Sequence, residues 1–321
     1  MPPPGSPASD RGADDRNAVL AVVVVVFLWS VANLFVRAGE TNALVFTTWR
    51  LWIALPPLAV FVAAQARRHG SAALWPDRVP RRTWAVSMLG AGALFVASVA
   101  TTFSAIRMTT LLDVTLISLL QPVIVVVFAV AFLHERVRAS NIARAAVAIA
   151  GTVLVAAAAT NSGTWSLAGD LVAVVALLLN SAWFLYGRVL RMRVAVDPVA
   201  FMFGTLVAGT LVLTPVAVVA EGSLAISGRG LFFAACVAVS GSTAHILMLW
   251  AHRFVPTSVS APLMLAELPI VAVGAWVWFG ESINALQVVG SVVVVVALWG
   301  VFRSPVVERI EDEIPDPEPP M

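Results

Sequence analysis

The sequence predicts an all-α integral membrane protein of ten transmembrane helices, arranged as two inverted five-helix repeats. Of its 321 residues, 60% are hydrophobic and 12% are charged, whereas soluble chains carry roughly 25% charged residues. The mean hydropathy is +0.92. About ten apolar stretches reach the ~20 residues that a helix needs to cross a bilayer. Runs such as residues 21–28 do not alternate in polarity, which excludes an outer-membrane barrel.

The ten apolar stretches define the predicted spans and the domain boundaries. The spans cover residues 17–36, 43–65, 83–104, 109–132, 139–159, 167–187, 198–219, 230–250, 256–279 and 283–302. Residues 17–159 form the first five-helix repeat, and residues 167–302 form the second. The tails at 1–16 and 303–321 are rich in proline and charge and are predicted to be disordered. The first tail lacks the charged n-region and cleavage site of a signal peptide.

The arginines predict the orientation, because the chain contains no lysine. With the N-terminus in the cytoplasm, sixteen of the 20 arginines fall in inner segments. The outer segments hold Arg37, Arg107 and Arg229, and Arg50 lies within a span. This excess follows the positive-inside rule and predicts a multi-pass protein of the cell (inner) membrane with both termini in the cytoplasm.

A passage that begins at a proline and ends at a glutamate occurs once in each half. Pro122 opens an apolar run that ends at Glu135, and Pro269 opens one that ends at Glu281. Five spans per half place the two copies upside down relative to each other. Inverted repeats are typical of secondary transporters, whose substrate site lies between the halves near the bilayer midplane.

The residues of this repeat resemble the drug/metabolite transporter superfamily, specifically its EamA-type members. The resemblance covers residues 18–302, with His134 in place of the usual glycine in the first half. It is carried by Thr47-Thr48-Trp49-Arg50, by Gln121-Pro122 with His134-Glu135-Arg136, and by Leu268-Pro269 with Phe279-Gly280-Glu281. The resemblance implies a ten-helix carrier that moves small metabolites, amino acids or drugs by alternating access.

Ionisable residues inside the predicted spans are the first candidates for a site, because each costs at least ~2.5–3.5 kcal/mol to insert. Glu267 lies about ten residues into the ninth span, near the midplane. Its counterpart in the first half is Leu120, so the repeat does not require the charge. Glu267 is interpreted as binding a substrate amine or a coupling proton; the alternative is a protonated carboxyl group between helices. His245 in the eighth span could share that proton or make an ordinary interhelical hydrogen bond.

Arg50 and Asp113 both fall in the outer halves of their spans. An ion pair between them would form an outer gate, bind a substrate carboxylate, or simply orient the second and fourth helices. Asn180, Trp183 and Tyr186 form a polar and aromatic stripe in the sixth span. Asn33 and Gln121 are polar positions in the first and fourth spans. These five residues either line a cavity or join helices by hydrogen bonds.

The copied residues Pro122, Glu135, Pro269 and Glu281 are interpreted as structural. Each glutamate ends a span and is expected to stabilise the positive end of the following helix. Small residues of the fifth and tenth spans, such as Ala146, Ala150 and Gly290, indicate close helix packing.

Several functions are excluded or disfavoured by the sequence. The sequence lacks a basic patch with interleaved aromatic residues, so nucleic acid is not an expected partner. The four histidines and the single cysteine, Cys236, form no metal-binding motif. No cofactor is expected and no enzyme motif is found. The expected partners are a small-molecule substrate and the lipid bilayer, and the sequence leaves monomer and homodimer open.

The leading hypothesis is a secondary active transporter that exports a small metabolite, amino acid or drug and couples to protons through Glu267. The alternatives are a non-transporting scaffold or receptor and, less well supported, a membrane enzyme acting on lipids. The sequence does not identify the substrate.

Overall fold

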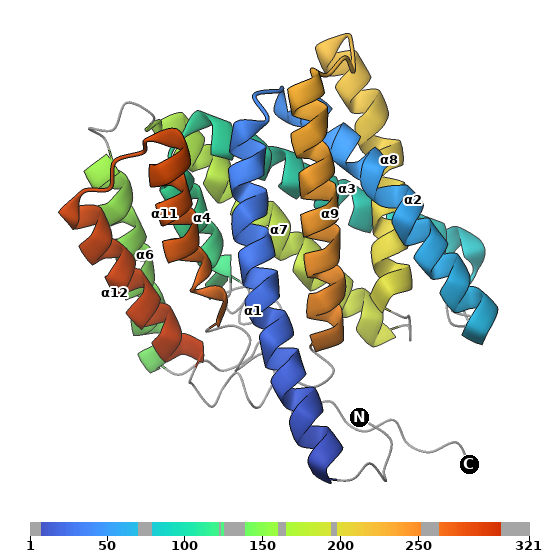
Figure 1. Ribbon diagram of the computed structural model, residues 1–321, viewed down its shortest axis with the longest axis horizontal. Helices are drawn as coiled ribbons and strands as arrows, with labels where there is room; N and C mark the ends of the chain where they lie inside the picture. The colour runs from blue at the N-terminus through green and yellow to red at the C-terminus, as the bar shows by residue number, and fades with distance from the viewer. Residues whose placement is uncertain are drawn as a thin grey trace.

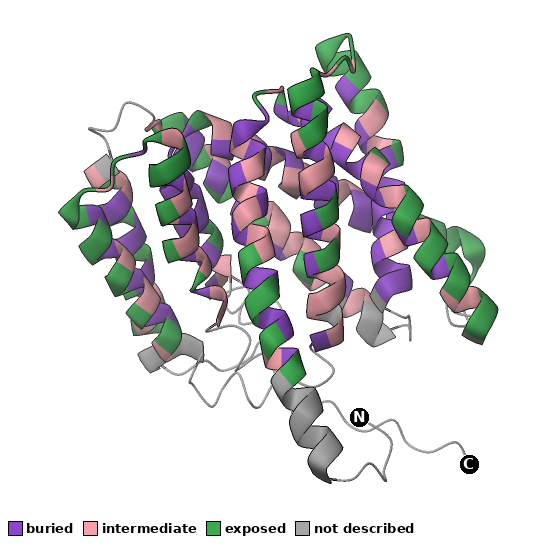
Figure 2. Cartoon of the chain, viewed as in Figure 1, coloured by how far each residue is buried: buried purple, intermediate pink, exposed green. Residues whose placement is uncertain are grey.

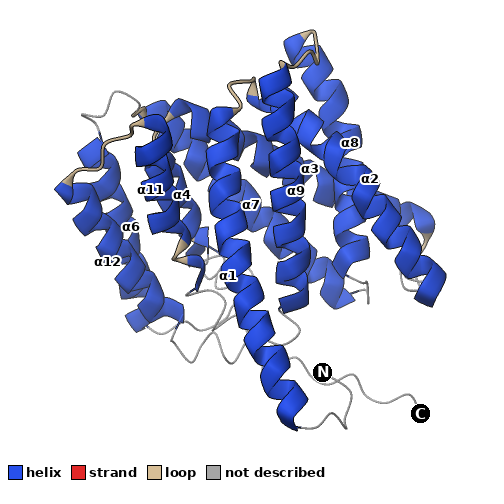
Figure 3. Ribbon diagram, viewed as in Figure 1, coloured by secondary structure: helices blue, strands red, loops and turns tan. Residues whose placement is uncertain are grey.

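The computed structural model describes residues 8–69, 79–121, 123–124, 139–159, 165–193, 198–251 and 263–302. All regular elements in this part of the chain are α-helices (Figure 3). They are α1 (Ala8–Ala38), α2 (Ala43–His69), α3 (Arg81–Met108), α4 (Leu111–Leu119), α6 (Ala139–Ala159), α7 (Leu167–Arg193), α8 (Pro198–Glu221), α9 (Gly228–Ala251), α11 (Glu267–Phe279) and α12 (Ala285–Phe302). Helices satisfy every internal backbone hydrogen bond within one segment, as a lipid environment requires.

Six of the described helices are long and apolar enough to cross a membrane. The six segments are Asn17–Ala38, Ala43–Arg68, Arg81–Met108, Leu167–Gly187, Val199–Glu221 and Gly228–Met248. Shorter apolar helices lie at Ile142–Ala158, Glu267–Phe279 and Ala285–Gly300. The prediction of a multi-pass membrane protein is therefore confirmed. The described residues contain six helices of sufficient length, so ten full spans stay a prediction.

The predicted fourth and ninth spans differ from the helices observed there. Among the described residues, α4 ends at Leu119, three positions before a proline in the sequence. Proline cannot donate a backbone hydrogen bond, so a regular helix is not expected to run through it. α11 begins at Glu267, which places Pro269 in its first turn, where a missing N–H is tolerated. The expectation that Glu267 lies ten residues inside a continuous helix is therefore corrected.

The first helix begins earlier than the sequence predicted. α1 starts at Ala8, inside the segment 1–16 that was expected to be disordered. The prolines of this segment end at Pro7, so nothing prevents a helix from starting at the next residue. The disorder prediction is wrong for residues 8–16. The tail at 303–321 lies outside the described residues.

The two halves of the chain run in opposite directions (Figure 1). α1 rises from the edge of the molecule near the N-terminus, whereas α7, the first helix of the second half, starts at the opposite edge. The links from α1 to α2, α3 to α4, α8 to α9 and α11 to α12 all lie at this opposite edge. The orientation predicted from the arginines places this edge on the outside of the cell, so it is called the outer edge below.

Helix packing repeats when the halves are exchanged. α1 packs on α9, and the equivalent helices α7 and α3 pack on each other. In the same way α1 with α11 corresponds to α7 with α4, and α2 with α9 corresponds to α8 with α3. Exchanging the halves interchanges α2 with α8, α4 with α11 and α6 with α12. The two helices of each of these pairs pack on each other. The core of the molecule is thus an interface between its halves.

Glycines permit the closest approaches in this interface. A Cβ added to Gly92 in α3 would lie 2.5 Å from the backbone nitrogen of Gly209 in α8. A Cβ on Gly151 in α6 would lie 3.4 Å from the carbonyl oxygen of Gly290 in α12. Small residues at such crossings are typical of membrane helix packing. The predicted packing face at Gly290 is therefore used within the chain.

Large apolar side chains cover much of the outside (Figure 2). Examples are Val60 on α2, Val219 on α8 and Val277 on α11, which are 71%, 85% and 71% exposed. Extensive exposed apolar surface is rare in soluble monomers. It is the surface expected of a protein in contact with lipid.

Candidate functional site

Asn33 and Glu267 meet across the interface between the halves. The side-chain Nδ2 of Asn33 in α1 donates a hydrogen bond to Oε1 of Glu267, at 2.9 Å. Glu267 is the first residue of α11, where the helix dipole favours a negative charge. Both residues were predicted as site candidates, but their contact was not. The expected proton sharing with His245 is not found among the described contacts of Glu267.

Asn180 and Gln121 form the equivalent contact in the other half. Nδ2 of Asn180 in α7 donates to Oε1 of Gln121, at 3.1 Å. Asn33 and Asn180 are equivalent positions in the register that aligns the two repeat prolines. Gln121 lies one position from the equivalent of Glu267 in that register. The two contacts differ in chemistry, because one has a carboxyl group where the other has an amide.

Arg50 is buried and forms no ion pair with any residue that the structure describes. The residue is 7% exposed, and its Nε and Nη1 have no hydrogen-bond partner among the described residues. Its Cζ lies 5.6 Å from the ring centroid of Phe103 in α3, a cation–π contact. Gly241 in α9 leaves room for the guanidinium, since a Cβ there would lie 3.2 Å from Nη2.

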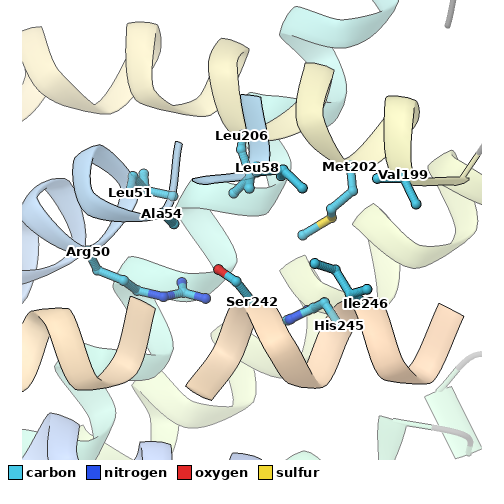
Figure 4. A pocket seen from close by; sticks show the side chains of 10 residues that line it. All are labelled: Arg50, Leu51, Ala54, Leu58, Val199, Met202, Leu206, Ser242, His245 and Ile246. Atoms are coloured by element: carbon cyan, nitrogen blue, oxygen red, sulfur yellow. The ribbon is translucent and has the colours of Figure 1, made fainter. Parts of the chain in front are cut away.

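Arg50 lines a cavity between α2, α8 and α9 (Figure 4). Its side chain extends toward Ser242, and His245 follows along α9. The rest of the lining is aliphatic apart from Met202. It consists of Leu51, Ala54, Leu58, Val199, Met202, Leu206 and Ile246. One cationic side chain therefore lies at the edge of an apolar space.

His245 belongs to an aromatic cluster next to this cavity. Its Nδ1 lies 2.7 Å from the carbonyl oxygen of Gly241, so this nitrogen donates and Nε2 is left for another partner. Its ring meets Trp29 of α1 edge-on at 5.3 Å and Phe95 of α3 at 6.5 Å. Trp183 of α7 packs on Phe95 at 5.1 Å. Nε1 of Trp183 is buried and has no partner among the described residues.

Tyr186 joins two helices. Its hydroxyl group donates to the carbonyl oxygen of Ser87 in α3, at 3.1 Å. Gly90 leaves room for the phenol, since a Cβ at Gly90 would lie 3.1 Å from the hydroxyl oxygen. Of the two interpretations given for the predicted stripe, this contact favours helix joining for Tyr186.

Asp113 lies at the outer edge rather than beside Arg50. Its Oδ2 accepts a hydrogen bond from the hydroxyl group of Thr110 at 2.6 Å, and its N–H donates to the same hydroxyl at 3.1 Å. These are the contacts of a helix N-cap, and Thr110 is the N-cap residue of α4. No ion pair links Asp113 to Arg50 in the described part of the chain. The gate that the sequence suggested for this pair is absent from this conformation.

Glu281 also lies at the outer edge, where it contacts the other half of the chain. Its carboxylate lies 3.1 Å from Nη2 of Arg37 at the end of α1 and accepts a hydrogen bond from the N–H of Leu111 at 3.1 Å. It thus stabilises the N-terminus of α4, not that of the following helix. The following helix, α12, is capped by Asn284 and Gln287, because the backbone N–H of each donates to the side-chain oxygen of the other at 2.9 Å.

Burial raises the pKa of Glu281, which lies in the link after α11, above its ordinary value. The nearby guanidinium of Arg37 and the N–H of Leu111 act in the opposite direction. Arg37 itself donates to the carbonyl oxygens of Ile106 and Thr109. Next to them, Asp170 accepts hydrogen bonds from Thr109 at 2.7 Å and from Nε1 of Trp165 at 2.9 Å.

We call this group of residues the outer cluster. It consists of Arg37, Thr109, Thr110, Asp113, Trp165, Asp170 and Glu281. Sequence reasoning missed most of it and treated Arg37 only as a marker of orientation. The available signal was that Arg37 and Glu281 end predicted spans on the same side of the membrane.

The remaining sequence predictions concern the copied residues and metals. Pro122 and Glu135 lie outside the described residues, and Pro269 is exposed in the first turn of α11. In the described residues, His, Cys, Asp and Glu form no group of three that could hold a metal ion.

Comparisons with known proteins agree with this architecture. The model of the EamA-like transporter family matches residues 16–157 and 167–303. A solved structure described as "Crystal structure of protein" has a TM-score of 0.61 and 19% identity, and the match covers 92% of this chain and 99% of that chain. At that identity the likeness concerns the fold alone. A comparison with curated proteins finds no match. The family model matches most of the chain, once in each half, and the protein is therefore a member of the EamA-like transporter family.

Proposed function

We propose that this protein is a secondary active transporter that exports a small organic solute from the cytoplasm by alternating access. Its ten spans would form two inverted repeats in the cell membrane, with both termini in the cytoplasm. The family supports transport, and the antiparallel halves support an inverted repeat. In such carriers the two halves rock around a site between them.

The observation that carries the proposal is the equivalent pair of contacts between the halves. Asn33 reaches Glu267, and Asn180 reaches Gln121. Each contact joins a helix of one half to a helix of the other. Polar contacts inside the membrane are few and must be broken or remade when the halves move. They are therefore suitable points for a solute or a proton to favour one state over another.

Glu267 is the proposed proton-binding residue. A carboxyl group within a membrane is costly when charged, so protonation and deprotonation there change the energy of the surrounding contacts strongly. The equivalent contact has an amide, which resembles a protonated carboxyl group but does not titrate. Coupling would thus reside in one half of a nearly symmetric pair.

The outer cluster is the proposed barrier on the outer side. It joins α1, α4 and α7 to the link before α12. Export requires this barrier to open, so the ion pair between Arg37 and Glu281 would separate during each cycle.

Flux measurements in proteoliposomes test the proposal. A panel of metabolites and drugs is first screened for thermal stabilisation of the purified protein, and the stabilising solutes are then followed across the bilayer with and without a pH gradient. We expect saturable flux that responds to the gradient in the wild type. Glu267→Gln should retain a stable fold but lose the response to the gradient.

Glu221→Gln is the matched control, because Glu221 is exposed at the end of α8. It should transport like the wild type. Absence of flux for every stabilising solute would contradict a transport function. An unchanged gradient response in Glu267→Gln would contradict the role given to Glu267 but not transport itself.

A further inference from the structure

Among the residues that the structure describes, no carboxylate pairs with the charge of Arg50. Only 7% of the residue is exposed, and an arginine guanidinium stays protonated in proteins. Its Nε and Nη1 have no hydrogen-bond acceptor in the part of the chain that the structure describes. A buried charge without a partner destabilises a fold strongly. Such a residue is typical of a site whose partner arrives as a ligand.

The described carboxylates that could neutralise Arg50 are engaged elsewhere. Asp113 accepts from Thr110 and Glu267 accepts from Asn33. Glu281 pairs with Arg37. Beside the guanidinium itself, the described lining of the cavity presents two polar side chains, Ser242 and His245.

The neighbouring polar groups also favour an acceptor as the missing partner. His245 donates through Nδ1 to the carbonyl oxygen of Gly241, so Nε2 of the neutral ring is an acceptor and gives nothing to an anion. Trp183, whose ring packs on Phe95 beside His245, has a buried Nε1–H without a described partner. Indole N–H groups can only donate. The unpartnered N–H groups of Arg50 and Trp183 therefore favour a ligand that accepts hydrogen bonds.

The lining of the cavity restricts the kind of anion. Besides Arg50, Ser242 and His245, it consists of seven apolar side chains from α2, α8 and α9. A doubly charged phosphate needs more donors than one guanidinium and one hydroxyl group provide. A carboxylate matches a single guanidinium, which can bind it through two parallel hydrogen bonds. In this conformation the cavity has room for little more than one water molecule, so α2, α8 and α9 would have to separate for the aliphatic lining to enclose the apolar part of the same molecule.

We propose that Arg50 binds the carboxylate of an amphipathic organic acid in the cavity between α2, α8 and α9. The inference rests on the proposed transport function in one respect, namely that this acid is the transported solute. The binding itself requires no transport and is tested separately.

Calorimetric titration of the full-length protein in detergent tests the site with ligands that share one apolar group but differ in charge. The probes are 3-phenylpropionate, the neutral 3-phenylpropanamide and the cationic 3-phenylpropylamine, together with straight-chain carboxylates of increasing length. We expect saturable binding of at least one carboxylate, with the amide and the amine weaker by about tenfold or more, because hydrogen bonds between charged groups are lost.

Two variants of Arg50 and one control locate the effect. Arg50→Gln should lose carboxylate binding, and Arg50→Lys should retain part of it, because it keeps the charge but not the planar fork. Arg229→Gln is the control, because Arg229 is an exposed arginine that pairs with Glu40. It should bind like the wild type. Thermal unfolding of each variant checks the fold, and Arg50→Gln should unfold no earlier than the ligand-free wild type.

Three results would overturn the site. They are failure of every carboxylate to bind the wild type, equal binding of the acid and its amide, and unchanged carboxylate binding in Arg50→Gln. If carboxylates bind through Arg50 but never cross the bilayer, the site stands and the transport function fails. If other solutes are transported but charge is not discriminated, the transport function stands and the site fails.

Discussion

Two arginines of this protein, the partly buried Arg37 and the buried Arg50, have opposite surroundings. Arg37, at the outer end of α1, pairs with Glu281 and donates to two backbone carbonyl groups. Arg50, one helix further along the chain, lies against Phe103 and an apolar cavity with two of its nitrogen atoms unpartnered in the described residues. The first arginine holds parts of the fold together. The second costs stability, and we attribute its presence to a ligand.

The largest effect expected from this comparison is the loss of Arg37. Arg37→Gln leaves the carboxylate of Glu281 buried without its counter-ion, and removing one member of a buried pair typically costs about 3–5 kcal/mol. We expect a clear drop in the thermal unfolding temperature in detergent. Arg229→Gln breaks an exposed pair and should change stability by about 1 kcal/mol or less. Equal effects of the two substitutions would show that the outer cluster does not stabilise the fold.

Substitution of Arg50, unlike that of Arg37, should leave the stability of the ligand-free protein unchanged or raise it. Arg50→Met removes unpartnered buried donors, whose burial costs roughly 1–3 kcal/mol or more, and loses a cation–π contact of about 1–2 kcal/mol. We expect the ligand-free variant to unfold at the same temperature as the wild type or higher. The wild type should regain the advantage when a carboxylate ligand is present. A marked loss of stability in Arg50→Met would mean that Arg50 is structural, like Arg37.

A smaller effect should follow from filling the space beside Arg50. Gly241→Ala places a Cβ 3.2 Å from Nη2 of Arg50, so the guanidinium must move by a few tenths of an ångström. Alanine otherwise favours a helix interior over glycine by ~0.5–1 kcal/mol. We expect weaker carboxylate binding without a loss of stability, measured by titration and thermal unfolding. Gly228→Ala on the same helix, where a Cβ meets nothing within 4 Å, should leave binding unchanged.

The smallest effect expected is a change in pH dependence at Glu281. Because burial raises its pKa above the ordinary 4.5, its contribution to stability is complete below that pH and is lost as the pH rises through the raised pKa. The unfolding temperature of the wild type minus that of Glu281→Gln should therefore fall as the pH rises above about 4.5. A difference that grows with pH would mean that Arg37 outweighs burial.

Composition and the arginine distribution predicted the membrane class, and the duplicated passage predicted the two repeats. These features depend on hydrophobicity and on local sequence, so one chain suffices to find them. The extents of α4 and α11 were predicted less well, because an apolar run does not reveal where a helix is interrupted. The early start of α1 at Ala8 was missed because a polar composition does not by itself prevent a helix.

The candidate residues were predicted better than their partners. Asn33, Asn180, Gln121 and Glu267 were all named from polarity within spans, and the structure joins them as two equivalent pairs. A partner more than 200 positions away in the chain leaves no local signal. The proposed pair of Arg50 with Asp113 relied on matching depth in the membrane. Depth does not specify which face of each helix is involved.

The central claim is that the charge left unpaired at Arg50 is there to bind the transported solute. The most direct test is counterflow of radiolabelled carboxylate in proteoliposomes, with the acid chosen by titration and with equal amounts of folded wild type, Arg50→Gln and Arg229→Gln. The account predicts saturable counterflow for the wild type and for Arg229→Gln, and none for Arg50→Gln. Equal counterflow by Arg50→Gln and the wild type would contradict it.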